Sequence, residues 1–183
     1  MLPLTTVVDV LTEYPALAVA LAIALRLGRA YQTQLTWPEY RTAHRFKRGL
    51  FPLVARLPTV GTALPWVSDK GGREDAEYLR TIDGSVRGVV TDLQAAGASL
   101  HLLNSLKRRP DTHGDPLTAA HVVWTVAGTT EQVEGYLFRN DDGTVDLYAH
   151  TETSVDDPLG HLTDPQTDGD AHGVVPEKEA SGG

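Results

Sequence analysis

The pattern that most restricts the fold of this chain is a turn between two segments of alternating side chains. Residues 140–143 read Asn-Asp-Asp-Gly, and the segments Gln132–Arg139 and Thr144–Glu152 flank them. Asp142-Gly143 suits a two-residue type I′ turn, in which both central residues need positive φ. The sequence therefore predicts an antiparallel hairpin of defined register. The expected cross-strand pairs are Arg139 with Asp146, Leu137 with Tyr148 and Phe138 with Leu147, and the expected apolar face holds Tyr136, Phe138, Val145, Leu147 and Ala149.

Further elements before this hairpin complete a small core. Ala119–Val126 alternates as another strand, and Ser99–Leu106 favours one more. A helix is expected from Ser85, a good N-cap, to Gly97, a good C′ residue. Glu74–Thr81 is expected to form a short helical turn. The predicted fold class is α+β: an N-terminal helical arm, then a core with an antiparallel β-meander of three to four strands and one or two helices, then a disordered or extended acidic C-terminal tail.

An apolar segment dominates the start of the chain. Tyr14–Leu25 holds 12 uncharged residues, in which alanines alternate with larger apolar side chains. Because Ala and Leu favour helix, a helix over Thr5–Gln32, bent at Pro15, is expected. A membrane span needs ~20 apolar residues, and extending this segment backwards includes Asp9 and Glu13. A buried or interfacial helix is therefore predicted.

A second helix is marked by Thr36-Trp37-Pro38-Glu39, a capping box with proline near the first helical position. This helix should end before Pro52 because proline breaks the hydrogen-bond ladder. It carries a cluster of cations, Arg41, Arg45, Lys47 and Arg48. An ordinary solvated face and a contact for an acidic partner both remain open for this cluster.

Charge is divided unevenly along the chain. Residues 1–60 hold seven Arg or Lys and three Asp or Glu. Residues 61–183 hold nine Arg or Lys and twenty-one Asp or Glu. The acidic part would repel phosphate, so acidic lipid headgroups or an acidic neighbouring subunit are better partners for the cations than nucleic acid. The predicted divisions are an apolar and basic helical arm (1–51), a Pro/Gly-rich linker (52–73), an α+β core (74–152) and an acidic tail (153–183).

The composition has a halophilic texture. Asp outnumbers Glu 15 to 9, and Arg outnumbers Lys 12 to 4. Surplus carboxylates with few lysines suit a surface that stays soluble in concentrated salt. This composition, together with the amino-acid sequences of residues 100–117 and 143–170, resembles that of small uncharacterised proteins of halophilic archaea and of their viruses and proviruses. A bacterium with a mildly acidic proteome is the alternative.

Candidate chemistry is sparse. The chain has no Cys, which excludes disulfides, thiolate metal sites and Cys nucleophiles. No catalytic motif and no cofactor-binding pattern is recognised. The densest set of potential metal ligands is His150, Glu152 and His161. Two residues apart on one strand share a face, and imidazole with carboxylate suits zinc, manganese or iron.

These patterns favour a non-enzymatic interaction or structural protein, a subunit or accessory of a larger assembly such as a virion or a provirus-borne particle. Its expected partners are protein subunits, and its expected location is the cytoplasm or a virion. One alternative is a peripheral membrane protein anchored through residues 5–50. The other is a metal-dependent hydrolase. Nothing in the sequence indicates a small-molecule substrate.

Overall fold

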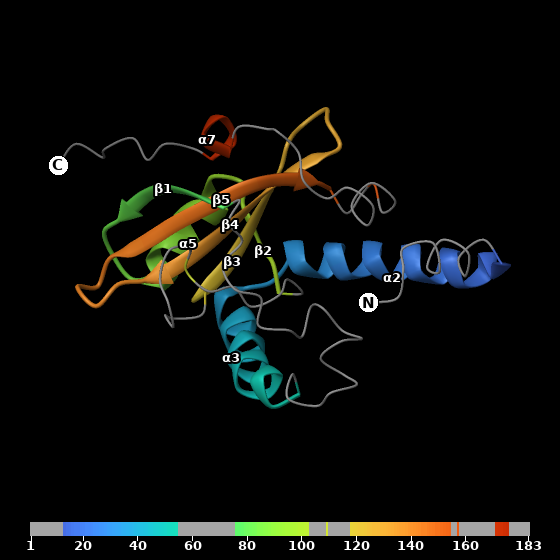
Figure 1. Cartoon of the computed structure of the whole chain (residues 1–183), viewed down its shortest axis with the longest axis horizontal. Coiled ribbons are helices and arrows are strands. Elements are labelled where there is room, and N and C mark those ends of the chain that lie inside the picture. The colour runs from blue at the N-terminus through green and yellow to red at the C-terminus, as the bar shows by residue number, and fades with distance from the viewer. Residues whose placement is uncertain are drawn as a thin grey trace.

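The centre of the molecule is a five-stranded antiparallel sheet with strand order β1-β5-β4-β3-β2 (Figure 1). The computed structural model describes residues 13–54, 76–102, 109, 118–154, 157 and 171–175. In chain order the elements are α2 (Pro15–Thr33), α3 (Trp37–Val54), β1 (Glu77–Ile82), α5 (Val86–Ala95), β2 (Ser99–Leu100), β3 (Ala120–Thr125), β4 (Glu131–Arg139), β5 (Val145–Thr153) and α7 (Ala171–Val174). The predicted α+β class is confirmed. The described residues form five strands, whereas three to four were predicted.

The β4–β5 hairpin lies where the sequence predicts it, but its loop is longer. The N–H of Asn140 donates to the carbonyl of Thr144 at 2.9 Å, and Gly143 has a φ of 91°. The loop therefore spans three residues, 141–143, with glycine in the left-handed position. The predicted two-residue loop is wrong, and so is its register. The observed pairs are Arg139 with Val145, Phe138 with Asp146 and Leu137 with Leu147.

This one-residue shift changes which side chains share a face, because successive residues of a strand point to opposite sides. Tyr136 and Phe138 were predicted on the apolar face, but they lie on the other one. The apolar face carries buried side chains from three central strands: Val122, Trp124, Val133, Leu137, Val145, Leu147 and Ala149. It forms the main core cluster with residues of α5.

Helix α5 has the predicted boundaries. The hydroxyl of Ser85 accepts a hydrogen bond from the N–H of Gly88 at 3.2 Å. Gly97 has a φ of 93°, and the N–H of Ala98 donates to the carbonyl of Leu93 at 2.9 Å, which is the geometry of a Schellman motif. The buried residues of the helix are Val89, Val90 and Leu93. Capping thus fixes both ends of the helix that covers the apolar face.

The predicted helical turn over Glu74–Thr81 is wrong. Residues 77–82 instead form β1, which pairs with β5 and has an irregularity between Tyr78 and Arg80. The segment is rich in residues that suit strands, and the exposed edge of β5 supplies the hydrogen-bond partners. Of the predicted strand Ser99–Leu106, residues 99–100 form β2, and residues 103–106 lie outside the described residues.

Helix α2 begins at Pro15, which suits a first helical position because it needs no hydrogen-bond donor there. The predicted start at Thr5 lies outside the described residues. Helix α3 begins at Trp37 after the predicted cap. Both the N–H and the hydroxyl of Thr36 donate to the carboxylate of Glu39, at 2.9 and 2.7 Å.

The predicted end of α3 before Pro52 is wrong, since the helix continues to Val54. Proline in the last turn removes one hydrogen bond from the ladder, and only two residues follow it. Helix α3 is joined to the core, because Tyr40 is fully buried in the main cluster. Helix α2 projects away from the sheet (Figure 1). None of the described helices has the length and hydropathy needed to span a membrane.

Part of the predicted acidic tail also packs on the core. Helix α7 lies against β5, and both Ala171 and Val175 are buried in the main cluster. The composition did not predict this contact. The predicted linker, apart from residues 52–54, lies outside the described residues.

Candidate functional site

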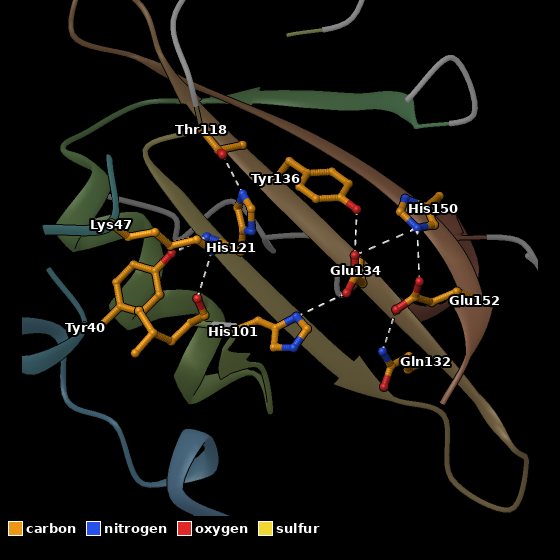
Figure 2. Close-up of polar contacts among 11 residues, drawn as sticks. Tyr40, Lys47, His101, Thr118, His121, Gln132, Glu134, Tyr136, His150 and Glu152 are labelled. Atoms are coloured by element: carbon orange, nitrogen blue, oxygen red, sulfur yellow. Dashed lines mark hydrogen bonds and ion pairs between the residues drawn. The ribbon is translucent and has the colours of Figure 1, made fainter. Parts of the chain in front are cut away.

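Polar side chains line the second face of the sheet and are buried there. Strand β4 contributes Gln132, Glu134 and Tyr136, and β5 contributes His150 and Glu152. The register places Glu134 opposite His150, and Gln132 opposite Glu152. We call these five residues, which Figure 2 shows clustered across the two strands, the sheet-face network.

Three potential ligand groups converge in this network. Nε2 of His150 lies 3.6 Å from Oε2 of Glu152 and 3.9 Å from Oε2 of Glu134. The three side chains are only 3 to 5% exposed. One ligand atom from each lies within 4.8 Å of those of the other two. Two carboxyl groups and one imidazole therefore lie close together in a buried region.

The surrounding residues hold both carboxylates in place. Nδ1 of His101 lies 3.1 Å from Oε1 of Glu134, and the hydroxyl of Tyr136 donates to Oε2 at 2.6 Å. Gln132 donates from Nε2 to Oε1 of Glu152 at 2.7 Å. The ring of Tyr136 also stacks on the imidazole of His150, with centroids 5.4 Å apart.

The charge state of Glu134 follows from its neighbours. Burial by itself raises the pKa of this carboxyl. The hydrogen bond from His101 and the charges of His101 and His150 together outweigh burial, and they hold the pKa well below its usual range. The neighbours of Glu134 therefore favour its ionised form.

A second group of buried polar residues joins α3 to β3. The hydroxyl oxygen of Tyr40 accepts a hydrogen bond from the N–H of His121 at 2.9 Å, and the ring of His44 stacks on Tyr40. Nζ of Lys47 donates to the carbonyl of Leu102 at 3.0 Å. Burial raises the pKa of Tyr40, whereas burial and the charge of Lys47 lower the pKa of His44 to about 3 and that of His121 well below its usual value.

The structure brings together two of the three predicted metal-ligand candidates, His150 and Glu152. His161 lies outside the described residues. Glu134 joins the pair instead. It was not among the predicted ligands, because the predicted register places it on the face opposite His150. The available signal was the alternation in β4 of polar and apolar positions: Gln132, Glu134 and Tyr136 against Val133, Gly135 and Leu137.

A hollow of about 800 Å³ adjoins α3 and the first turn of α5. Five arginines from α3, α5 and β4 line it: Arg41, Arg45, Arg48, Arg87 and Arg139. Asp141 is the only acid among its described lining residues. Within the described ranges, none of the five arginines forms an ion pair. We call this feature the arginine hollow.

Three of the four predicted interaction residues, Arg41, Arg45 and Arg48, line the arginine hollow. They lie at i, i+4 and i+7, which is one side of a helix. The fourth, Lys47, is buried against Leu102 instead. Arg87 and Arg139 could not be predicted as neighbours of α3, because only the tertiary fold brings these distant positions together.

Helix α2 carries an exposed apolar row. Val19, Ile23, Leu27 and Tyr31 are 53 to 65% exposed and follow one another at intervals of four residues. Side chains in such a row form a ridge, which helix packing places in the groove of a second helix. We call this row the α2 ridge.

Comparison with known proteins identifies no relative: no family model, curated protein or solved structure matches the chain.

Proposed function

We propose that this chain is a non-enzymatic interaction protein, a subunit or accessory of a larger assembly, and that the arginine hollow binds an acidic segment of a partner protein. The observation that carries the proposal is the convergence of five arginines from three elements in a chain whose net charge is −8. Like charges gathered at one place repel one another, so such a cluster suits an anionic partner.

Arginine is well suited to this role. Its planar guanidinium can bind a carboxylate through two parallel hydrogen bonds, and it is desolvated more readily than an ammonium group. The first turn of α5 also borders the hollow, and the positive end of the helix dipole lies there. A short acidic segment can place several carboxylates within this volume.

The charge distribution favours an acidic peptide segment over nucleic acid. Residues 61–183 carry a net charge of −12, so a long phosphate backbone would be repelled over most of its length. A segment that enters the hollow meets mainly cations, because only Asp141 opposes it among the described lining residues. Acidic segments of protein subunits, including a second copy of this chain, fit that restricted geometry.

The test is binding of a fluorescent Asp/Glu-rich octapeptide, measured by anisotropy with the full chain and with the double variant Arg45→Gln/Arg87→Gln. Exposed ion pairs each contribute about 0.2–1 kcal/mol, so the double variant should bind about 2–30-fold more weakly. Arg80→Gln, which removes a half-buried cation on β1 outside the hollow, is the control, and its unfolding curve establishes that it folds. Equal affinity of the double variant and the unaltered chain would refute the proposed site.

A peripheral membrane protein is the second candidate, and the α2 ridge is the observation that favours it. Four large apolar side chains in a row can enter the interface of a bilayer. The same ridge also suits a helix of a partner subunit. The two candidate partners of the α2 ridge differ in shape. A bilayer offers no groove that is complementary to the ridge, whereas a partner helix does.

Flotation with vesicles of phosphatidylcholine and phosphatidylserine separates these candidates. If lipid is the partner, the full chain should float, and Ile23→Asn/Leu27→Asn should remain at the bottom of the gradient. If the interaction is with protein, both forms should stay at the bottom. If the partner helix belongs to a second copy of this chain, the full chain alone should also associate with increasing concentration in sedimentation experiments.

A further inference from the structure

We propose that Glu134, His150 and Glu152 bind a first-row divalent cation, Zn²⁺ or Mn²⁺, on the buried polar face of the sheet. This site is independent of the arginine hollow, since no residue is shared between them. It lies within the sheet-face network, and all three ligands come from the adjacent strands β4 and β5 (Figure 2).

The donor set selects the class of cation. Carboxylate oxygens bind hard divalent ions, and an imidazole nitrogen favours zinc, manganese or iron over magnesium and calcium. Two carboxylates and one imidazole leave a coordination position for water or a further ligand, as in metal sites with three protein donors. The chain has no Cys, so the donors are limited to nitrogen and oxygen.

The distances between the donor atoms also favour a shared cation. Nε2 of His150 lies 3.6 and 3.9 Å from the two carboxylate oxygens. A hydrogen bond between such atoms would be about 2.7–3.2 Å long. Two ligands that are each about 2.1 Å from a tetrahedral zinc are roughly 3.4 Å apart. The observed separations are therefore closer to ligand spacing than to hydrogen-bond length.

The backbone presets this arrangement. Glu134 and His150 are directly opposed in the ladder, and Glu152 follows His150 by two residues on the same face. Opposed residues lie about 4.5–5.5 Å apart at Cβ, which lets two ligand side chains meet without bending either strand. The site therefore rests on the most extensively paired part of the sheet rather than on loops.

Outer contacts hold both carboxylates of the site. Gln132 holds one oxygen of Glu152 and leaves Oε2 directed at His150. His101 and Tyr136 bind the carboxylate of Glu134. Partners of this kind orient ligating groups, and their removal typically weakens metal binding by about 10–100-fold.

The experiment titrates the metal-stripped full chain with Zn²⁺, Mn²⁺ and Mg²⁺ in a calorimeter. We expect one Zn²⁺ or Mn²⁺ per chain and much weaker binding of Mg²⁺. The isosteric variants Glu134→Gln and Glu152→Gln should each weaken Zn²⁺ binding by about 100-fold or more, and Gln132→Leu by about 10–100-fold. Unfolding curves recorded without metal establish that each variant folds.

Two variants serve as controls. Glu131→Gln removes a carboxylate of β4 that lies outside the cluster, and His172→Gln removes an exposed imidazole on α7. Both should bind metal like the unaltered chain. The proposal is overturned if the unaltered chain binds no stoichiometric Zn²⁺ or Mn²⁺, if Glu134→Gln and Glu152→Gln bind normally, or if His172→Gln alone abolishes binding.

Discussion

Glu134 lies directly opposite His150 in the β4–β5 ladder, with 3.9 Å between Oε2 and Nε2. This relationship depends on the three-residue loop at 141–143. A two-residue loop would place Thr151 opposite Glu134 and would move His150 to the apolar face. The length of a surface turn thus decides whether the sheet-face network exists.

Gly143→Ala should destabilise the protein by about 1 kcal/mol, because an L-residue is strained in the left-handed region. Gly143 has a φ of 91°, and no described atom lies within 4 Å of an added Cβ, so backbone strain is the only expected cost. Gly49→Ala is the matched control. It lies inside α3 with equally open surroundings, and alanine there should stabilise by up to about 1 kcal/mol. Urea unfolding measures both changes, and an unaltered midpoint for Gly143→Ala would contradict the assigned turn.

Gly135→Ala should destabilise through packing rather than backbone strain. An added Cβ would lie 2.8 Å from the ring of Trp124 and 2.9 Å from a methyl of Val122. Overpacking of this kind costs about 1–3 kcal/mol. Guanidinium unfolding gives the value, and Gly135→Ala/Trp124→Phe, which removes the closest contact, should recover part of the loss. A fully stable Gly135→Ala would mean that Trp124 lies elsewhere.

His44 should make the protein sensitive to acid. Its pKa is lowered from 6.5 to about 3 by burial and by the charges of Lys47 and Arg48. Between these values the unfolded chain binds a proton that the folded chain does not, so stability falls as pH decreases from about 6.5 towards 3, by about 1.4 kcal/mol per pH unit. His121, whose pKa is also lowered, acts in the same direction.

His44→Gln tests that contribution in unfolding experiments between pH 4 and 7. In the variant, the slope of the unfolding free energy against pH should fall by about the contribution of one proton. His172→Gln, which removes an exposed imidazole, should keep the slope of the unaltered chain. An identical slope for His44→Gln and the unaltered chain would show that His44 is protonated in the folded protein.

Binding of the acidic octapeptide should weaken as salt rises, because the arginines of the hollow are partly exposed. In a halophilic setting, which the composition predicts, the screening length falls to about 3 Å at 1 M salt. Only direct arginine–carboxylate contacts would then remain effective. Arg45→Gln/Arg87→Gln should therefore show a shallower salt dependence than the unaltered chain, and parallel curves would argue against these two contacts.

Local patterns in the sequence were sufficient for much of the fold. The caps of α5, the strands β3 to β5 and the start of α3 depend on neighbouring residues, and each was predicted to within one residue. The strand β1 was not, because its hydrogen-bond partners belong to β5. The residues of this segment suit a strand, but the strand forms only by pairing with a distant part of the chain.

The candidate metal site could be predicted only in part for a related reason. Asp-Gly is compatible with hairpin loops of two and of three residues. The choice between the two loop lengths involves contacts with residues far away in the sequence. The hydroxyl of Thr81 donates to Asp146 at 2.6 Å, and Arg109 donates to the side-chain oxygen of Asn140 at 2.6 Å. These contacts hold residues on both sides of the loop. Without them the register was misjudged by one residue, and Glu134 was separated from His150.

The position of Lys47 has a practical consequence. Its amine is enclosed between α3 and the backbone at Leu102, with the residue only 6% exposed. A reagent that acylates amines should therefore modify this lysine only when α3 lifts from the sheet. The rate at which mass spectrometry detects that adduct would report how often the helix detaches, without any change to the sequence.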